Sequence, residues 1–136
     1  MAFLVLIVWG FVLFNDLIGK PFEYGGRGPV GYDCYGLAME VYKRRGINLK
    51  EYYSPDNLSI IGNLVEDGKE DFIPLEKPEP FCFVLFRVPK YTTHIGVVLP
   101  DCKRFIHVSR GKNVSIERLD HIIWKTKISG YYRCIN

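Results

Sequence analysis

Apolar residues follow a helical period in the stretch after Asp33. Apolar side chains recur at 34, 37, 38, 41 and 42, which lie on one face of a helix. Asp33 is a favourable N-cap, the basic run 43–45 suits the negative end of the helix dipole, and Gly46 is a favourable stop. The pattern therefore predicts a helix that begins at Cys34, ends near Gly46 and turns Cys34 towards the core.

Beyond residue 80 the pattern changes to short runs rich in β-branched and aromatic residues, separated by turn residues. It predicts five strands: Phe81–Val88, His94–Leu99, Arg104–Ser109, Val114–Leu119 and Ile128–Cys134. One helix followed by closely spaced strands indicates an α+β domain with an antiparallel sheet on which the helix packs. Between Tyr52 and Pro80 the pattern is mixed, with a helix predicted from Asp56 to about Glu66.

The segment Met1–Phe14 is an almost unbroken apolar run, for which three interpretations compete. It stops short of the roughly 20 residues that a transmembrane helix needs. It also lacks the basic start and small-residue cleavage site of a secretory signal. The interpretation favoured here is an N-terminal helix or strand packed on the domain, and a signal or membrane anchor stays as the alternative.

Length and composition limit the remaining chain, residues 15–136, to one folded domain. The protein has 136 residues, of which 48% are hydrophobic, enough for a single buried core. Its formal net charge of +3 mildly favours anionic partners such as cell-wall polymers. No basic block alternating with aromatic residues predicts a nucleic-acid groove, so no nucleic-acid partner is expected.

A glycine-rich stretch, 25–31, precedes the predicted helix and has the composition of a loop. It lacks the Lys-Ser/Thr ending and glycine spacing of phosphate-binding loops, which argues against that function. The four cysteines form no Cys-x-x-Cys pair, so no zinc or thioredoxin-like motif is present. Cys82 and Cys134, in apolar runs, are predicted to be buried thiols.

Cys34 is the candidate nucleophile because a helix start favours the reactive thiolate. Unpaired N–H groups and the positive end of the helix dipole lower a thiol pKa from about 8.5. A buried and inert cysteine is the alternative. His94 and His107 stand in strand-like runs that can face one helix, as a base and an orienting group for the thiol require. His121, in a polar stretch, is expected at the surface.

Four sequence motifs resemble the NlpC-type cell-wall peptidases, which are compact papain-like cysteine endopeptidases. The family pattern is Gly-x-Pro-aromatic-x-x-Gly-Gly, then Asp-Cys-Ser-Gly, a His-x-Gly strand, and a third polar residue about a dozen positions later. This chain matches with Gly19–Gly26, Asp33–Gly36, His94–Gly96 and His107. The Asp-Cys-Tyr-Gly-Leu variant and the ending Gly130–Arg133 look like the phage-tail branch.

The resemblance implies a function and a set of site residues. It implies hydrolysis of a stem-peptide amide in peptidoglycan, typically between D-glutamate and the next diamino acid, without metal or organic cofactor. Cys34 would be the nucleophile, His94 the base and acid, and His107 the orienting residue, with the Cys34 N–H helping to hold the oxyanion. Phage-tail or cell-envelope proteins are the implied partners, and the cell envelope, the extracellular space or a virion tail the implied location.

Three departures from the family pattern affect the predicted cleft. Phe22 stands where many members have a tyrosine, a loss for which Tyr24 is the candidate substitute. Tyr35 replaces the usual serine after the nucleophile and is expected to add bulk near the cleft mouth, beside Asp33. The stretch Glu79–Cys82 replaces a Pro-Gly-Asp turn. Two other functions stay open: a non-catalytic tail component, and an amidase or acyltransferase acting on a lipid or protein.

Overall fold

The computed structural model describes residues 14–51, 72–88 and 91–134. The predicted helix from Asp56 lies outside these residues, as does the apolar segment Met1–Phe14 except for Phe14, which is fully buried. A short 3-10 helix, η1, covers Asn15–Leu17. Within the described ranges, no helix is long and apolar enough to cross a membrane.

The single α-helix of the described chain, α2, spans Cys34–Arg44 and has the ends that the sequence predicts. The Asp33 side chain accepts a 2.6 Å hydrogen bond from the backbone N–H of Gly36, which is an N-cap. At the other end Gly46 has φ +81°, and Ile47 donates its N–H to the carbonyl of Tyr42 at 3.0 Å. This is the glycine-terminated closure that ends many helices.

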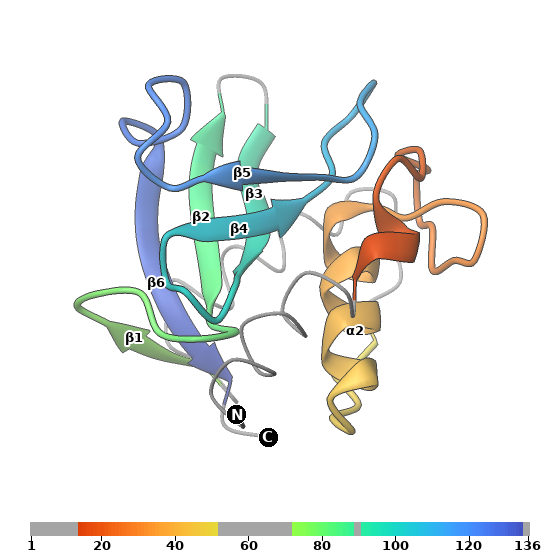
Figure 1. Cartoon of the computed structure of the whole chain (residues 1–136), viewed down its shortest axis with the longest axis horizontal. Helices are drawn as coiled ribbons and strands as arrows, with labels where there is room; N and C mark the ends of the chain where they lie inside the picture. Colours follow the sequence, from red (N-terminus) through yellow and green to blue (C-terminus); the bar gives the residue numbers. More distant parts are fainter. Residues whose placement is uncertain (1–13, 52–71, 89–90, 135–136) are drawn as a thin grey trace.

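Six antiparallel strands form one sheet in the order β1-β6-β2-β3-β4-β5. Figure 1 shows β4 and β5 crossing at a steep angle to β2 and β6. The strands are β1 Phe72–Leu75, β2 Phe83–Val88, β3 Tyr91–Val98, β4 Arg104–His107, β5 Ser115–Arg118 and β6 Ile128–Cys134.

The α+β prediction is confirmed, and the sheet contains one strand more than expected. β1 was missed because it is short and contains Pro74, which lacks the N–H of a ladder donor. Proline is tolerated here because β1 pairs only with β6 and forms an edge of the sheet.

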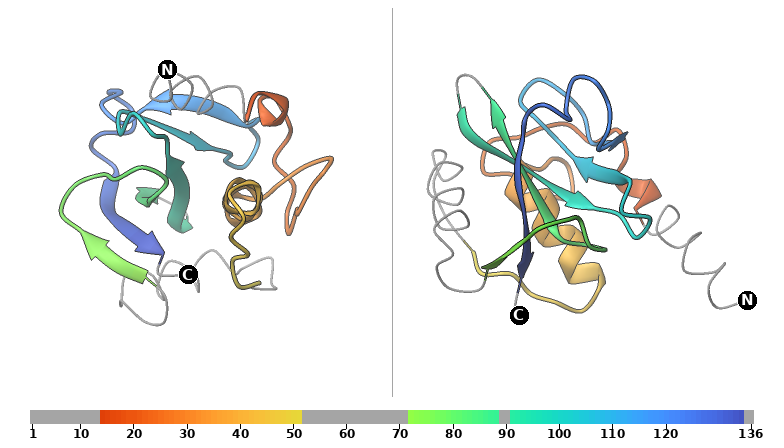
Figure 2. Two further views of the ribbon diagram at one scale, coloured as in Figure 1. Left: turned by 60° about the horizontal axis from the view of Figure 1, so that its bottom comes forward. Right: turned by 90° about the vertical axis from the view of Figure 1, so that its left-hand side faces the viewer.

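The sheet is buried on both faces along its centre, which explains why β2 is apolar from Phe83 to Phe86 without alternation. Phe83 and Leu85 face the core that α2 covers, whereas Val84 and Phe86 belong to a second apolar cluster on the outer face. Figure 2 shows α2 end-on beside the curved sheet. Because strand side chains alternate between faces, this arrangement places neighbouring residues of β3 in different surroundings as well.

The turn before β2 differs from the glycine-containing turn of the family pattern. Phe81 has φ +64°, a backbone conformation that residues with a Cβ atom adopt only at a cost in free energy. The Tyr42 hydroxyl donates a hydrogen bond to the Phe81 carbonyl, and the Arg45 guanidinium lies 3.8 Å from the centre of its ring. These contacts tie the turn to the C-terminal half of α2.

Candidate active site

Cys34 begins α2 and is almost completely enclosed, with 2% of its surface exposed. It belongs to the core cluster between α2 and the sheet. Backbone N–H groups of Ile95, Tyr35 and Cys34 itself act on the sulfur and favour its thiolate form. The thiol therefore sits at the junction of the helix start and β3, one residue along the strand from His94.

His94 and His107 are brought together where β3 and β4 stop pairing. The ladder between these strands consists of the pairs Val97–Ile106 and Val98–Phe105, and both histidines lie beyond it. His94 Nε2 and His107 Nδ1 are 2.7 Å apart, within hydrogen-bonding distance. Both residues are buried, with 5% and 3% of their surface exposed.

The Cys34 thiol and the two imidazoles lie on different faces of the sheet at β3. Ile95 faces the α2 core together with Cys34, whereas the His94 ring packs against Phe86 and Trp124 of the outer cluster. Among the described residues, the hydrogen bond of the His94 ring goes to His107 rather than to Cys34. Since His94 uses Nε2 for that bond, Nδ1 is the ring nitrogen left for the thiol.

Two further residues complete the histidine cluster, and the sequence analysis did not find them. Glu117 on β5 forms a hydrogen bond with Nε2 of His107. Trp124 forms a hydrogen bond with Glu117 and packs edge-on against His107, with ring centres 4.8 Å apart. The register of β4 with β5 is the signal that could have found Glu117. His107 pairs with Ser115, and Glu117 lies two residues further along β5, on the same face of the strand.

Burial decides the charges at this site. Burial raises the pKa of the Cys34 thiol to about 12, against the weaker effect of the backbone N–H groups. Burial also lowers the pKa of His94 to about 3, assisted by the neighbouring His107. The predicted lowering of the Cys34 pKa is therefore wrong, because loss of water outweighs the helix start. At neutral pH Cys34 is therefore a thiol and the His94 imidazole is uncharged.

The low pKa of His94 predicts a loss of stability in mild acid. Unfolded, this imidazole binds a proton below about pH 6.5, and in the folded protein it does so only near pH 3. Stability should therefore fall as pH drops through this window, by up to about 1.4 kcal/mol per pH unit. Urea unfolding between pH 7.5 and 5 measures the slope. His94→Gln should reduce it, and an equal slope in both proteins would contradict the assignment.

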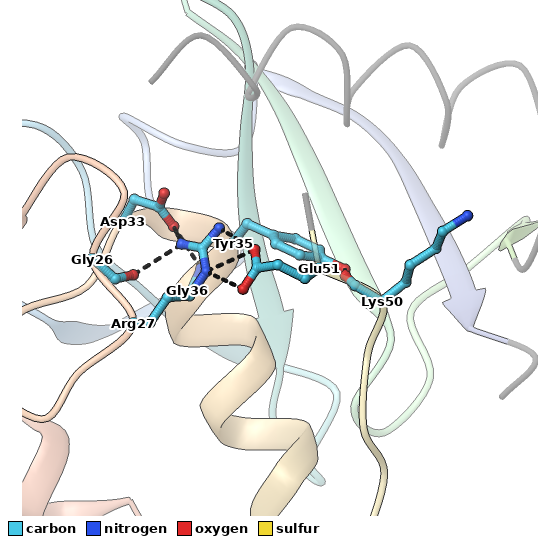
Figure 3. A network of polar contacts seen from close by, with 7 residues as sticks. All are labelled: Gly26, Arg27, Asp33, Tyr35, Gly36, Lys50 and Glu51. Carbon is cyan, nitrogen blue, oxygen red and sulfur yellow. Dashed lines mark hydrogen bonds and ion pairs between the residues drawn. The ribbon is translucent and has the colours of Figure 1, made fainter. Parts of the chain in front are cut away.

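A polar network fixes the loop before α2 to the helix start (Figure 3). Arg27 donates to Asp33 Oδ1 at 2.8 Å and to the Gly26 carbonyl at 3.0 Å, and it pairs with both carboxylate oxygens of Glu51. Asp33 is buried and its charge raises the Cys34 pKa, and Arg27 is the ion-pair partner of this carboxylate. The predicted glycine loop is therefore tied to the start of the helix that carries Cys34.

The contact between this loop and α2 predicts that Gly36→Ala destabilises the protein. An added Cβ would lie 2.0 Å from the Gly26 carbonyl oxygen, which belongs to backbone and cannot swing away. We expect a loss of about 2 kcal/mol in unfolding free energy, although alanine normally favours helices. Gly111→Ala is the control, since its positive φ costs about 1 kcal/mol but its Cβ meets open space. Equal losses in both variants would contradict the collision.

The residues predicted to line the cleft take three different positions. Tyr35 is 1% exposed and donates its hydroxyl to the Lys50 carbonyl at 2.6 Å, so it ties the helix to the chain after it instead of standing at a cleft mouth. Phe22 is half-buried and meets the exposed Tyr24 edge-on at 5.2 Å. The Arg110 guanidinium lies over the Tyr24 ring.

The other cysteines and the third histidine lie elsewhere. All four cysteines are free thiols; Cys82 is buried as predicted, whereas Cys134 is only half-buried. Burial raises the pKa of Cys82 to about 11. His121 is exposed, as expected. In the part of the chain that the structure describes, no group of three or more His, Cys, Asp or Glu residues is arranged to hold a metal ion.

The chain resembles proteins of known function in sequence. Residues 19–133 match the model of the NlpC/P60 family. A gamma-DL-glutamyl hydrolase of Bacillus subtilis is 30% identical over 121 residues, which cover 88% of this chain and 27% of the relative. The chain thus corresponds to about a quarter of that relative's length.

Solved structures show the same fold. An NlpC/P60 family protein of Bacillus cereus has a TM-score of 0.64 at 20% identity, with 96% of this chain and 39% of the other covered. The NlpC/p60 domain of the peptidoglycan hydrolase SagA has a TM-score of 0.59 at 18% identity, with 94% and 95% covered. Together with the match over residues 19–133, these similarities show that the chain belongs to the NlpC/P60 family.

Proposed function

We propose that this protein is a cysteine hydrolase that cleaves peptide bonds in peptidoglycan, with Cys34 as nucleophile and His94 as general base and acid. The observation that supports it best is the buried thiol beside Ile95, one residue from a histidine whose Nε2 is held by His107. A nucleophile, a base and an orienting group arranged in this order are what acyl transfer requires.

The neutral pair implies that the nucleophile is made during the reaction. Nδ1 of His94 takes the proton from Sγ of Cys34 as the sulfur attacks the substrate carbonyl carbon. The protonated imidazole then gives that proton to the leaving amine, so the amide bond breaks and a thioester to Cys34 remains. Water, deprotonated by His94, hydrolyses the thioester and restores the thiol. In this proposal the N–H of Cys34 at the helix start helps to stabilise the oxyanion.

We propose the D-glutamyl–diamino acid bond of the stem peptide as the substrate. The support is the family membership and the similarity to a relative that is described as a gamma-DL-glutamyl hydrolase. The net charge of +3 is compatible with an anionic wall polymer. A role as the wall-cutting part of a phage tail, placed at the cell envelope or in the virion, is a narrower form of this proposal and rests on the motif variants alone.

The test is the digestion of purified peptidoglycan, with the released fragments identified by mass spectrometry. We expect new fragments that end in D-glutamate and others that begin with the diamino acid, and none from the Cys34→Ala variant. Peptidoglycan left intact by both proteins would contradict the proposal and favour a non-catalytic tail component. An acyl group on Cys34 after incubation with a lipid donor would favour the acyltransferase alternative instead.

A further inference from the structure

A line of buried polar side chains leads from the histidine pair to the outer surface. His94 on β3 contacts His107 on β4, and His107 contacts Glu117 on β5. The two histidines are 5% and 3% exposed, whereas the Glu117 side chain is 31% exposed and lines a surface cavity of about 480 Å³. The proposed mechanism uses only the first two of these residues, so the function of Glu117 needs its own explanation.

The contacts of Glu117 determine where the protons of both imidazoles lie. Hydrogen bonds from His107 and Trp124 outweigh burial and hold the Glu117 pKa below its usual value, so Glu117 is an ionised group that only accepts hydrogen bonds. His107 must then carry its proton on Nε2, where it faces the carboxylate. Burial keeps His107 uncharged by lowering its pKa, so its Nδ1 has a lone pair.

The same reasoning extends to His94. Because Nδ1 of His107 is an acceptor, Nε2 of His94 must be the donor in the 2.7 Å contact between them. A neutral imidazole has one proton, so Nδ1 of His94 is left bare. This is the only tautomer in which His94 can receive a proton on the nitrogen that is not engaged with His107.

Trp124 holds the carboxylate in this position. Its indole forms a hydrogen bond with Glu117, and its ring covers both histidines, with ring centres 5.7 Å from His94 and 4.8 Å from His107. A glutamate present only for solubility would not be engaged by a buried imidazole and an indole on the same side of the sheet. Its neighbour Arg118, which pairs with Asp120, shows the surface arrangement that Glu117 lacks.

We propose that Glu117 is a positioning residue that sets the tautomers of His107 and His94, so that Nδ1 of His94 is the nitrogen that accepts the Cys34 proton. The inference rests on the proposed hydrolase function for its catalytic meaning, but the tautomers themselves are a property of the resting protein. Glu117 touches neither the thiol nor the substrate in this account and acts through His107.

The direct test is the tautomeric state of the imidazoles, read from long-range ¹H–¹⁵N NMR spectra of the ¹⁵N-labelled protein at pH 7. The chain has only 3 histidines, and the exposed His121 serves as an internal reference. In the wild type we expect both buried histidines as single Nε2–H tautomers. Glu117→Ala and Glu117→Gln should convert His107 to a mixture of tautomers, since neither side chain demands a donor.

Asp120→Asn is the matched control, because it neutralises a carboxylate near Glu117 that is fully exposed and pairs with Arg118. This variant should leave the tautomers unchanged. An Nδ1–H tautomer of His107 in the wild type, or an unchanged Nε2–H tautomer in the Glu117→Gln variant, would overturn the proposal. The wild-type spectrum decides the matter even where the alanine variant fails to fold.

Kinetics with the peptidoglycan substrate provide the second readout. The Glu117 variants should lower kcat by about 10- to 100-fold, as loss of an outer orienting group does elsewhere, with KM little changed and Asp120→Asn close to wild type. Wild-type kcat in Glu117→Gln would count against the positioning role. If no protein cleaves peptidoglycan, the proposed function fails, and the tautomers still test the inference about Glu117.

Discussion

Replacing Cys34 with alanine is expected to reduce kcat for cleavage of a stem peptide by at least about 10⁴-fold. Removing the proposed nucleophile removes the covalent route, which leaves only what binding and oxyanion stabilisation supply. The fold should survive, because alanine fits the space of a buried cysteine and leaves the Asp33 cap in place. The measurement is single-turnover cleavage of a defined peptide, with thermal unfolding of the same sample.

Cys82→Ala provides the matched control for this loss. Cys82 is also a buried free thiol with a raised pKa, but it belongs to the cluster on the outer face of the sheet. We expect its variant to keep wild-type kcat at temperatures where it is folded. Comparable activity in the Cys34→Ala protein would mean that another group attacks the substrate and would remove the basis for a cysteine mechanism.

His94→Gln is expected to lower kcat by about 10³-fold or more, since it removes the proposed base for the thiol proton and the proposed acid for the leaving amine. Glutamine has a similar size to histidine, so the packing against Phe86 and Trp124 is largely retained. With a Cys34 pKa of about 12, the variant has almost no thiolate at neutral pH and no group to generate it.

The residual activity of this variant should rise steeply with pH. Hydroxide replaces the missing base, so kcat is expected to increase about tenfold per pH unit up to the limit of protein stability. His121→Gln, which changes the exposed histidine, should behave as wild type. A His94→Gln protein with normal kcat and a flat pH profile would show that the thiol is activated by another residue.

The helix that carries the candidate nucleophile was predictable because its signals are local. The Asp33 cap and the Gly46 stop act within one turn of the chain, and both form as the residue types require. The bounds of β6 were also predicted correctly, since its apolar and aromatic run is framed by a polar turn. The pairing of His94 with His107 followed from two apolar strands that lie close together in sequence, but the expectation that both rings face the helix is wrong, since they pack against Trp124 and the outer cluster.

The features of the site that were not predicted from the sequence depend on burial and on strand register. The effect of the helix start on Cys34 was visible, but the complete loss of water that reverses its pKa shift depends on packing. Glu117 stands in the predicted strand Val114–Leu119, but its contact with His107 follows only from the register with β4. Tyr35 looked like a cleft residue because it neighbours the nucleophile, whereas its position on α2 turns it inward.

The central claim is that His94 activates the thiol of Cys34, and one measurement addresses it without any substrate. Wild type and His94→Gln are treated with iodoacetamide at pH 7, and the alkylation rate of Cys34 relative to that of the half-buried Cys102 is followed by peptide mass spectrometry. The account predicts that this ratio falls at least about tenfold in the variant. An unchanged ratio would mean that His94 does not share a proton with Cys34, and the proposed mechanism would be contradicted.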